Sequence, residues 1–343
     1  MFKFNTIEWW GRSILNTIKD IAKKCHVSIS TVSRALNGYS DINKDTKELV
    51  LKTADELDYI PNKNARDLVK KNNNHIAIII KELNEEFNPF QILSGLYDYV
   101  EILDYEVSLF TLGKSIKNGK SYYKFCKENN ISGALLYGME ANDPYVKELI
   151  DKKFPIVLVD CDLEGEKVVN IGIDNFSVAY EVTNYMIKKG CKKIKTIQGK
   201  RSLYITKQRV LGYEQALRDN GIEINSDNII YGEFSKQFGE KIVKSIIEYK
   251  NVDGIFCASD NIAIGVYEGL KRLNIKIPDE ISIVGCGDNE ISRYLTPSLT
   301  TIKQNTYNIG YNGAELLDKL IKNESVEKYV RLDYKFIERS SVI

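Results

Sequence analysis

The chain has 343 residues, too long for one core of ordinary size, so two or three domains are expected, and its 43% of hydrophobic residues can fill their cores. The 48 basic and 47 acidic residues leave a net charge of +1, which excludes a polycation and requires that any nucleic-acid binding rest on a local basic patch. No run of about 18 apolar residues occurs, so no membrane-spanning helix is expected.

Residues 17–38 predict two short helices across a tight turn. Thr17 can cap the first helix and Ser28 the second, and Gly38 can end the second helix. This pattern is typical of a helix-turn-helix, although any two-helix hairpin with a small residue at the crossing resembles one. The outward face of the second helix is predicted to carry Ile29, Ser30, Thr31, Ser33, Arg34 and Asn37.

This outward face has the chemistry of a DNA-reading surface. Its hydroxyl and amide groups can bind phosphates, and the guanidinium of Arg34 can donate two hydrogen bonds to a guanine edge. Nearby cations can supply the basic patch, with a merely solvated lysine-rich surface as the alternative. They are Lys19, Lys23, Lys24, Lys63, Lys70, Lys71, Arg34 and Arg66.

A third helix is predicted over 44–57, and YIPN at 59–62 and a short apolar segment follow it. Ala65, Leu68 and Val69 share one face of that segment. At about two turns it is too short to hold a helix alone in water, so we expect it to be frayed without DNA. The alternative is a passive linker whose side chains do not matter.

From His75 onward, apolar runs alternate with helical patterns, which favours parallel sheets covered on both faces. The number of runs predicts two doubly wound lobes with a ligand site between the carboxyl ends of their strands. The predicted strands are 76–80, 106–112, 133–137, 155–160, 193–198, 228–231, 254–258 and 282–286. The predicted helices are 89–103, 115–129, 143–152, 175–189, 206–220, 236–249 and 260–273.

The six cysteines show no C-x-x-C pair and lie mostly in or beside these apolar runs. They are interpreted as reduced thiols of a cytoplasmic protein, and neither a disulfide framework nor a metal site is predicted. No cofactor is predicted either. Residues 1–16 lack the apolar core and cleavage site of a secretory signal.

Four motifs of the first 70 residues occur in a characteristic order: TIKDIA, VSISTVSRALNG, YIPN and an AR-x-L turn. This order resembles the lactose-repressor (LacI/GalR) family of bacterial transcription regulators. The resemblance extends over nearly everything after Asn16. It rests there on FNPF (87–90), DN (174–175), R-x-x-GY (209–213), SDNIAIG (259–265), IPDEISIVG (277–285), PSLTTIKQ (297–304) and ERSSV (338–342).

The resemblance implies a fold class: an all-α helix-turn-helix domain followed by a two-lobed α/β periplasmic-binding-protein-like effector domain. Chain crossings between the lobes are implied near residues 173, 290–305 and 330. Family members usually begin just before the residue matching Thr17, so 1–16 are expected to be a disordered extension from an upstream start codon or, alternatively, an amphipathic anchor. The expected domains are therefore this extension at 1–16, a helix-turn-helix domain at 17–61, a hinge helix and linker at 62–74, and an effector-binding and dimerisation domain at 75–343.

The same resemblance implies double-stranded, near-palindromic operator DNA as the partner of a homodimer, with a tetramer possible. One helix-turn-helix reads only a half-site, which also favours two copies. Leu68 is expected to insert into the minor groove and kink the duplex. The predicted DNA-binding residues are Thr17, Ser28, Ile29, Ser30, Thr31, Ser33, Arg34, Asn37, Asn62, Ala65 and Leu68.

Strand geometry places Asp160 and the pair Ser259-Asp260 at the ends of two strands, where ligands bind in such folds. The resemblance implies a sugar site, with charged and amide groups for the hydroxyls and phenylalanines as flat walls. A capping carboxylate, a surface arginine and plain core aromatics are the alternatives. The predicted effector-binding residues are Phe87, Phe90, Asp160, Arg209, Phe234, Ser259, Asp260, Asp288 and Gln304.

One departure concerns specificity. Sugar-binding members commonly have G-F/Y-D-D where this chain has Gly285-Cys286-Gly287-Asp288, so a carboxylate is replaced by Gly287, and Ser259 stands in place of the more usual Asn. A sugar or a related metabolite is still favoured as the effector.

Two other functions are weighed against a regulator. An enzyme would need a dinucleotide loop, but Glu290 stands where the third glycine belongs, and His26 and His75 are the only histidines for a catalytic set. A transport-type sugar-binding protein would not carry residues 17–69. The sequence therefore predicts a cytoplasmic transcription regulator acting at the nucleoid, with repression favoured, whose operator affinity is controlled by a bound carbohydrate.

Overall fold

The computed structural model describes residues 16–59, 74–81, 89–103, 105–111, 121–248 and 252–343. The chain divides into two compact units, Met1–Asn73 and Asn74–Ile343. None of the described helices is long and apolar enough to cross a membrane. The six cysteines are buried free thiols, in agreement with their placement in or beside apolar runs.

The first unit contains the three helices that the sequence predicts: α1 (Ile18–Cys25), α2 (Ile29–Leu36) and α3 (Lys44–Glu56). Ser28 caps α2 by accepting a hydrogen bond from the Thr31 amide. The three helices share a small core, which is built from the apolar side chains that recur at helical spacing in each helix. Its buried members are Ile21, Ala22, Cys25, Val32, Ala35, Val50 and Ala54.

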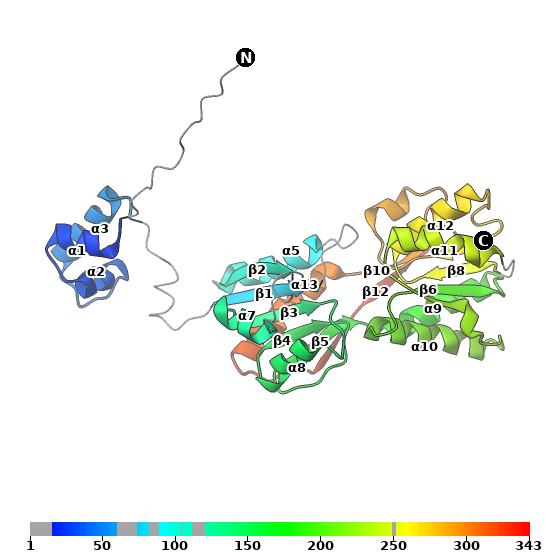
Figure 1. The fold of residues 1–343 in the computed structure, drawn as a ribbon, viewed down its shortest axis with the longest axis horizontal. Coiled ribbons are helices and arrows are strands. Elements are labelled where there is room, and N and C mark those ends of the chain that lie inside the picture. The colour runs from blue at the N-terminus through cyan, green and yellow to red at the C-terminus, as the bar shows by residue number, and fades with distance from the viewer. Residues whose placement is uncertain (1–15, 60–73, 82–88, 104, 112–120, 249–251) are drawn as a thin grey trace, which may run out of the picture. The chain divides into compact units, whose positions relative to one another are not determined.

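The second unit is a two-lobed α/β domain with two parallel sheets (Figure 1). In its described part, the first-lobe sheet has the order β11-β5-β4-β3-β1-β2 and the second-lobe sheet the order β7-β6-β8-β9. The first sheet consists of β1 (His75–Ile80), β2 (Glu106–Thr111), β3 (Gly133–Tyr137), β4 (Ile156–Val159), β5 (Val168–Ile173) and β11 (Tyr329–Leu332). The second consists of β6 (Ile194–Gln198), β7 (Ile229–Tyr231), β8 (Gly254–Cys257) and β9 (Ser282–Val284).

Helices cover both faces of each sheet, which explains why the strands read as continuous apolar runs. In β1, Ile76, Ile78 and Ile80 pack into one core and Ala77 and Ile79 into another. The first-lobe helices are α5 (Phe90–Val100), α7 (Tyr122–Glu128), α8 (Pro144–Asp151) and α13 (Thr306–Ile321). The second-lobe helices are α9 (Asn175–Lys188), α10 (Tyr204–Asp219), α11 (Lys236–Glu248) and α12 (Asp260–Arg272). Short 3-10 turns are η1 (Glu101–Leu103), η2 (Ser226–Asn228) and η3 (Glu290–Arg293).

The described chain passes between the lobes after β5, between β10 (Thr301–Gln304) and α13, and between β11 and β12 (Tyr334–Ile337). The second and third passages lie side by side, because β10 and β12 pair antiparallel, with Thr301 opposite Ile337 and Gln304 opposite Tyr334. This pair lies between the two lobes in Figure 1. The carboxyl ends of β4 and β8 are thereby held at the junction of the lobes.

Five of the described strands and α-helices were not predicted from the sequence: β5, β10, β11, β12 and α13. Strands β10, β11 and β12 have four residues each, and β11 and β12 are only partly buried, so their apolar periodicity is weak. Strand β5 is a fully buried run of six residues that the sequence prediction overlooked. Helix α13 packs backbone to backbone on α5, since a Cβ on Gly310 would lie 2.0 Å from the Ile92 carbonyl oxygen and one on Gly95 would lie 2.0 Å from that of Tyr307. Its glycines therefore serve this close approach, although they lower its apparent helix propensity.

Candidate functional site

The amino-terminal end of α2 presents a cluster of hydroxyl groups. The Ser28 hydroxyl lies 2.7 Å from that of Ser30 and 2.8 Å from that of Thr31, and the side chain of Ile29 beside them is 46% exposed. Thr17 is exposed before α1, where its amide and hydroxyl each donate to the Asp20 carboxylate at 2.7 Å. A helix start of this kind can bind a phosphate.

In the carboxyl-terminal half of α2, some of the side chains predicted to point outward contact the helix itself. Ser33 and Asn37 are half-buried, not fully outward, and the Asn37 amide donates to the Ser33 carbonyl at 2.8 Å. Arg34 is exposed, and its guanidinium forms an ion pair with Asp41. Arg34 is therefore the long cationic donor on this face. The predicted contacts Asn62, Ala65, Leu68 and Phe87 lie outside the described residues.

The two lobes are joined by a chain of polar contacts that begins at Asp160, directly after β4. Asp160 Oδ1 accepts from Asn175 Nδ2 at 2.8 Å, and Asn175 Oδ1 accepts from Arg209 Nε at 3.0 Å. Arg209 Nη1 donates to the carbonyl of Ala258, at the end of β8. Asp160 and Arg209, which strand geometry and the resemblance single out, thus lie in one cluster with Asn175.

Arg209 is the donor in this cluster with unused capacity. The residue is 1% exposed, and its Nη2 has no hydrogen-bond partner among the described residues. A buried unsatisfied donor costs free energy, so a ligand atom that accepts a hydrogen bond from Nη2 would be favoured at this place. Three other buried polar atoms of the second lobe, Gln198 Oε1, Thr206 Oγ1 and Tyr267 Oη, share this condition within the described structure.

Burial dominates the electrostatics of this cluster. It raises the pKa of Asp160, and the neighbouring Arg209 charge and the Asn175 hydrogen bond oppose that rise. Burial likewise raises the pKa of Tyr137, at the end of β3; the Asp160 charge adds to this rise and the Arg209 charge opposes it. Cys286 has a pKa raised by burial and lowered in part by Arg209, and its Sγ accepts from Gln304 Nε2 at 3.4 Å. The cluster around Asp160 and Arg209 therefore combines a carboxylate, a guanidinium, a phenol and amide groups.

A second contact between the lobes lies at Glu140, in the segment after β3. Its carboxylate accepts from Lys81 Nζ at 2.7 Å. The pKa of Glu140 is lowered by hydrogen bonds from Lys81 and from Ser202, and Ser202 belongs to the segment after β6 of the second lobe. The described lobes therefore meet through polar groups outside the Asp160–Arg209 cluster as well.

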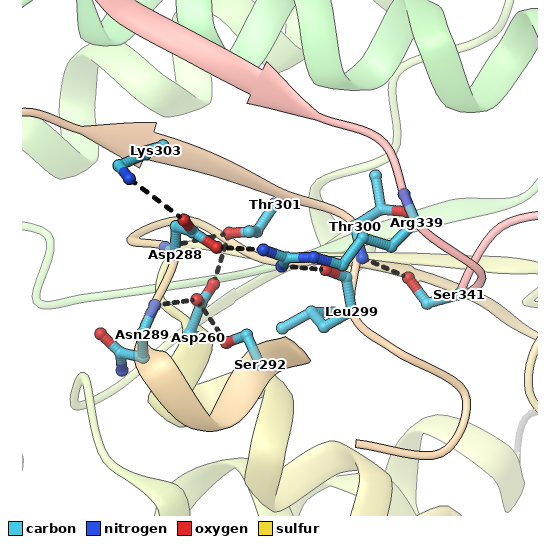
Figure 2. A network of polar contacts seen from close by, with 10 residues as sticks. All are labelled: Asp260, Asp288, Asn289, Ser292, Leu299, Thr300, Thr301, Lys303, Arg339 and Ser341. Carbon is cyan, nitrogen blue, oxygen red and sulfur yellow. Dashed lines mark hydrogen bonds and ion pairs between the residues drawn. The ribbon is translucent and has the colours of Figure 1, made fainter. Parts of the chain in front are cut away.

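Asp260 and Asp288 belong to a polar network within the second lobe (Figure 2). Asp260 is 0% exposed, and its carboxylate accepts from the Asn289 amide at 2.8 Å and from the Ser292 and Thr301 hydroxyls at 2.6 Å each. Both oxygens of Asp260 thus accept from donors of this chain, and its contact with the effector remains a prediction.

Asp288 is occupied in a similar way. Its carboxylate pairs with the Arg339 guanidinium and lies 3.9 Å from Lys303 Nζ (Figure 2). Only 4% of the Asp288 side chain is exposed. The carboxylate that follows Gly287 therefore anchors the segment after β12, and its contact with the effector remains a prediction.

The remaining predicted residues have mixed environments. Ser259 caps α12 by accepting from the Ile262 amide at 3.2 Å, and Phe234 packs against the second-lobe core, over Gly199. Phe90 begins α5 and is 65% exposed. Asn175 and Tyr137 belong to the cluster but were missed, although Asn175 stands in the DN pair directly after the first passage between lobes.

Comparison with known proteins identifies both units. The model of bacterial regulatory proteins of the lacI family matches residues 17–62, and that of the periplasmic binding protein-like domain matches residues 183–342. The HTH-type transcriptional regulator RegA of Clostridium acetobutylicum is 36% identical over 332 residues, which cover 95% of this chain and 98% of that protein. The HTH-type transcriptional regulator MalR of Clostridium butyricum is 31% identical, with 94% and 98% covered.

Solved structures agree with this. The complex of the transcriptional regulator CelR with cellobiose has a TM-score of 0.72 at 25% identity and covers 95% of this chain and 99% of that one. The lac repressor bound to ONPG in the repressed state, with a TM-score of 0.80 at 22% identity and 95% and 99% covered, shows the same fold. These matches decide against the enzyme and the transport protein. The chain therefore belongs to the LacI family of bacterial regulatory proteins and is a DNA-binding transcription regulator.

Proposed function

We propose that this regulator is a repressor that binds a near-palindromic operator as a homodimer and responds to a small carbohydrate held at the Asp160–Arg209 cluster. As a DNA-binding protein it acts in the cytoplasm, at the nucleoid. The observation that carries the proposal is the buried Nη2 of Arg209, which has no hydrogen-bond partner among the described residues and lies where the strand ends of both lobes meet.

A carbohydrate fits the chemistry of that place. The Asp160 carboxylate accepts from Asn175 and from the Ile173 backbone, and its remaining lone pairs can accept from a sugar hydroxyl while Arg209 Nη2 donates to a sugar oxygen. Such charge-assisted bonds would bridge β4 of the first lobe and α10 of the second. A ligand that bridges two lobes favours one lobe arrangement over another, which is how it can change DNA affinity at a distance. The CelR–cellobiose complex supports a carbohydrate.

The first experiment is a search for the effector. A panel of mono- and disaccharides and their phosphates is tested for thermal stabilisation of the full chain. A ligand present at about 100 times its dissociation constant adds about 2.7 kcal/mol to the free energy of unfolding. A hit that also changes operator affinity supports the proposal. If none of the carbohydrates stabilises the chain at millimolar concentration, the result argues against the proposal.

The DNA half of the proposal predicts the effect of Arg34→Ala. The variant is expected to lose roughly 1–3 kcal/mol of discrimination at one base pair of each half-site, because a forked guanidinium–guanine contact disappears. Duplexes selected from a random library define the operator, and titration of single base-pair variants measures the loss. Thr31→Ala is the control, since losing a phosphate contact weakens all sequences alike. Unchanged base preference in Arg34→Ala would show that another residue reads the DNA.

A further inference from the structure

The turn after α2 carries an acidic residue that contacts the candidate base-reading arginine. Asp41 Oδ2 pairs with Nη2 of Arg34, and the Arg34 guanidinium carbon lies 5.5 Å from the centre of the Tyr39 ring. The two charged side chains are 50% and 49% exposed, so the pair lies on the surface of the helix-turn-helix unit. Arg34 is therefore contacted from two sides.

The backbone of the turn explains this arrangement. Gly38 has a φ of +77°, the left-handed conformation that commonly ends a helix. Its amide donates to the Ala35 carbonyl at 3.2 Å, and the Tyr39 amide donates to the Arg34 carbonyl at 3.1 Å. These two bonds fold the chain back over the last turn of α2. Tyr39 and Asp41 are thereby brought beside the Arg34 side chain, although Asp41 follows Arg34 by seven residues in the chain.

We propose that Asp41 is a positioning residue for base reading, acting through Arg34. A guanidinium has five N–H groups in one plane, so a carboxylate can hold one of them while an adjacent pair still faces the O6 and N7 acceptors of a guanine. Asp41 fixes the plane and direction of that fork. The inference rests on the proposed function, in which the outward face of α2 enters the major groove.

The pair acts on specificity and adds little to folding stability. A solvent-exposed ion pair contributes little to folding, because water screens it and two long side chains must be ordered. In a groove, water is displaced and the same contact is stronger. Without Asp41, Arg34 is free to swing to a phosphate, a contact that any sequence offers. Removal of the carboxylate also removes a negative charge from the proposed DNA-binding face, which favours non-specific binding.

The test compares four variants of the full chain: Asp41→Ala, Asp41→Asn, Arg34→Ala and the double variant of both alanines. Glu48→Ala is the matched control, since it removes an exposed carboxylate of α3 from the same unit. Operator duplexes selected from a random library with the unchanged protein are altered one base pair at a time. Their dissociation constants and those of an unrelated duplex are measured by fluorescence anisotropy at two fixed salt concentrations. Thermal melting of each variant checks the fold.

Asp41→Ala is expected to lose about three- to ten-fold of the preference for one base pair per half-site, at the position that Arg34→Ala affects. Binding to the unrelated duplex stays equal or becomes tighter. Asp41→Asn, which keeps an acceptor without the charge, gives an intermediate loss, and the double variant loses no more than Arg34→Ala alone. Glu48→Ala keeps the preference, although it shares the change in charge.

The outcomes separate this inference from the proposed function. If Arg34→Ala loses base preference and Asp41→Ala and Asp41→Asn keep it, Asp41 is no positioning residue, while base reading by α2 stands. A loss in Asp41→Ala that is spread over all positions, or matched by Glu48→Ala, also overturns the inference, because it reports general charge. If neither Arg34→Ala nor Asp41→Ala changes any preference, base reading by Arg34 fails, and the inference fails with it.

Discussion

Asp260→Ala is expected to lower the free energy of unfolding by about 3–5 kcal/mol. The substitution leaves the Asn289 amide and the Ser292 and Thr301 hydroxyls buried without their acceptor, and each hydrogen bond to a charged group is worth roughly 1.5–3 kcal/mol, with incomplete additivity. The loss concerns more than one loop, because these donors tie η3 and β10 to the start of α12 (Figure 2). Urea unfolding followed by circular dichroism measures the loss.

Two matched variants sharpen this test. Asp260→Asn keeps the size and one acceptor oxygen, and we expect it to lose about half as much, since one set of donors stays satisfied. Asp279→Ala removes an exposed carboxylate of the same lobe and is expected to change stability by no more than about 0.5 kcal/mol. A loss in Asp260→Ala that is no larger than that of Asp279→Ala would mean that the network contributes little to the fold.

Arg209→Lys is expected to weaken effector binding by about 10- to 100-fold. A lysine keeps the positive charge beside Asp160 but lacks the Nη2 donor and the fork that also reaches Asn175 and Ala258. Each charge-assisted hydrogen bond lost costs roughly 1.5–3 kcal/mol, which corresponds to that range of affinity. Calorimetric titration with the carbohydrate that stabilises the unchanged protein measures the affinity, and anisotropy measures operator binding without it.

The control for this prediction lies on the same helix. Arg218→Lys alters an exposed arginine of α10 that contacts Gln215, and effector affinity should stay at the level of the unchanged protein. Operator binding in the absence of effector should persist in both variants, because the helix-turn-helix unit is unaltered. An Arg209→Lys protein that responds to the carbohydrate at unchanged concentrations would place the effector site elsewhere.

The sequence alone determined the parts of this protein that depend on local signals. The three amino-terminal helices have apolar residues at helical spacing, and Ser28 and Gly38 at the ends of α2 are residues whose chemistry starts and stops a helix within a few positions. The buried strands β1, β3, β4 and β8 are continuous apolar runs, since both their faces are covered. Arg34 could be chosen because helical periodicity places it outward.

The tertiary structure decided which polar residues are free to act. Asp160 and Asp260 look alike in sequence, since each follows an apolar strand, but the partners of Asp260 stand 29, 32 and 41 positions further along the chain and close over it. Asp160 instead meets Asn175 and, through it, Arg209. Contacts between residues so distant in sequence depend on the positions of β10 and η3 in the second lobe. Local sequence periodicity does not predict those positions. The pair of Arg34 with Asp41 likewise depends on the backbone of one turn.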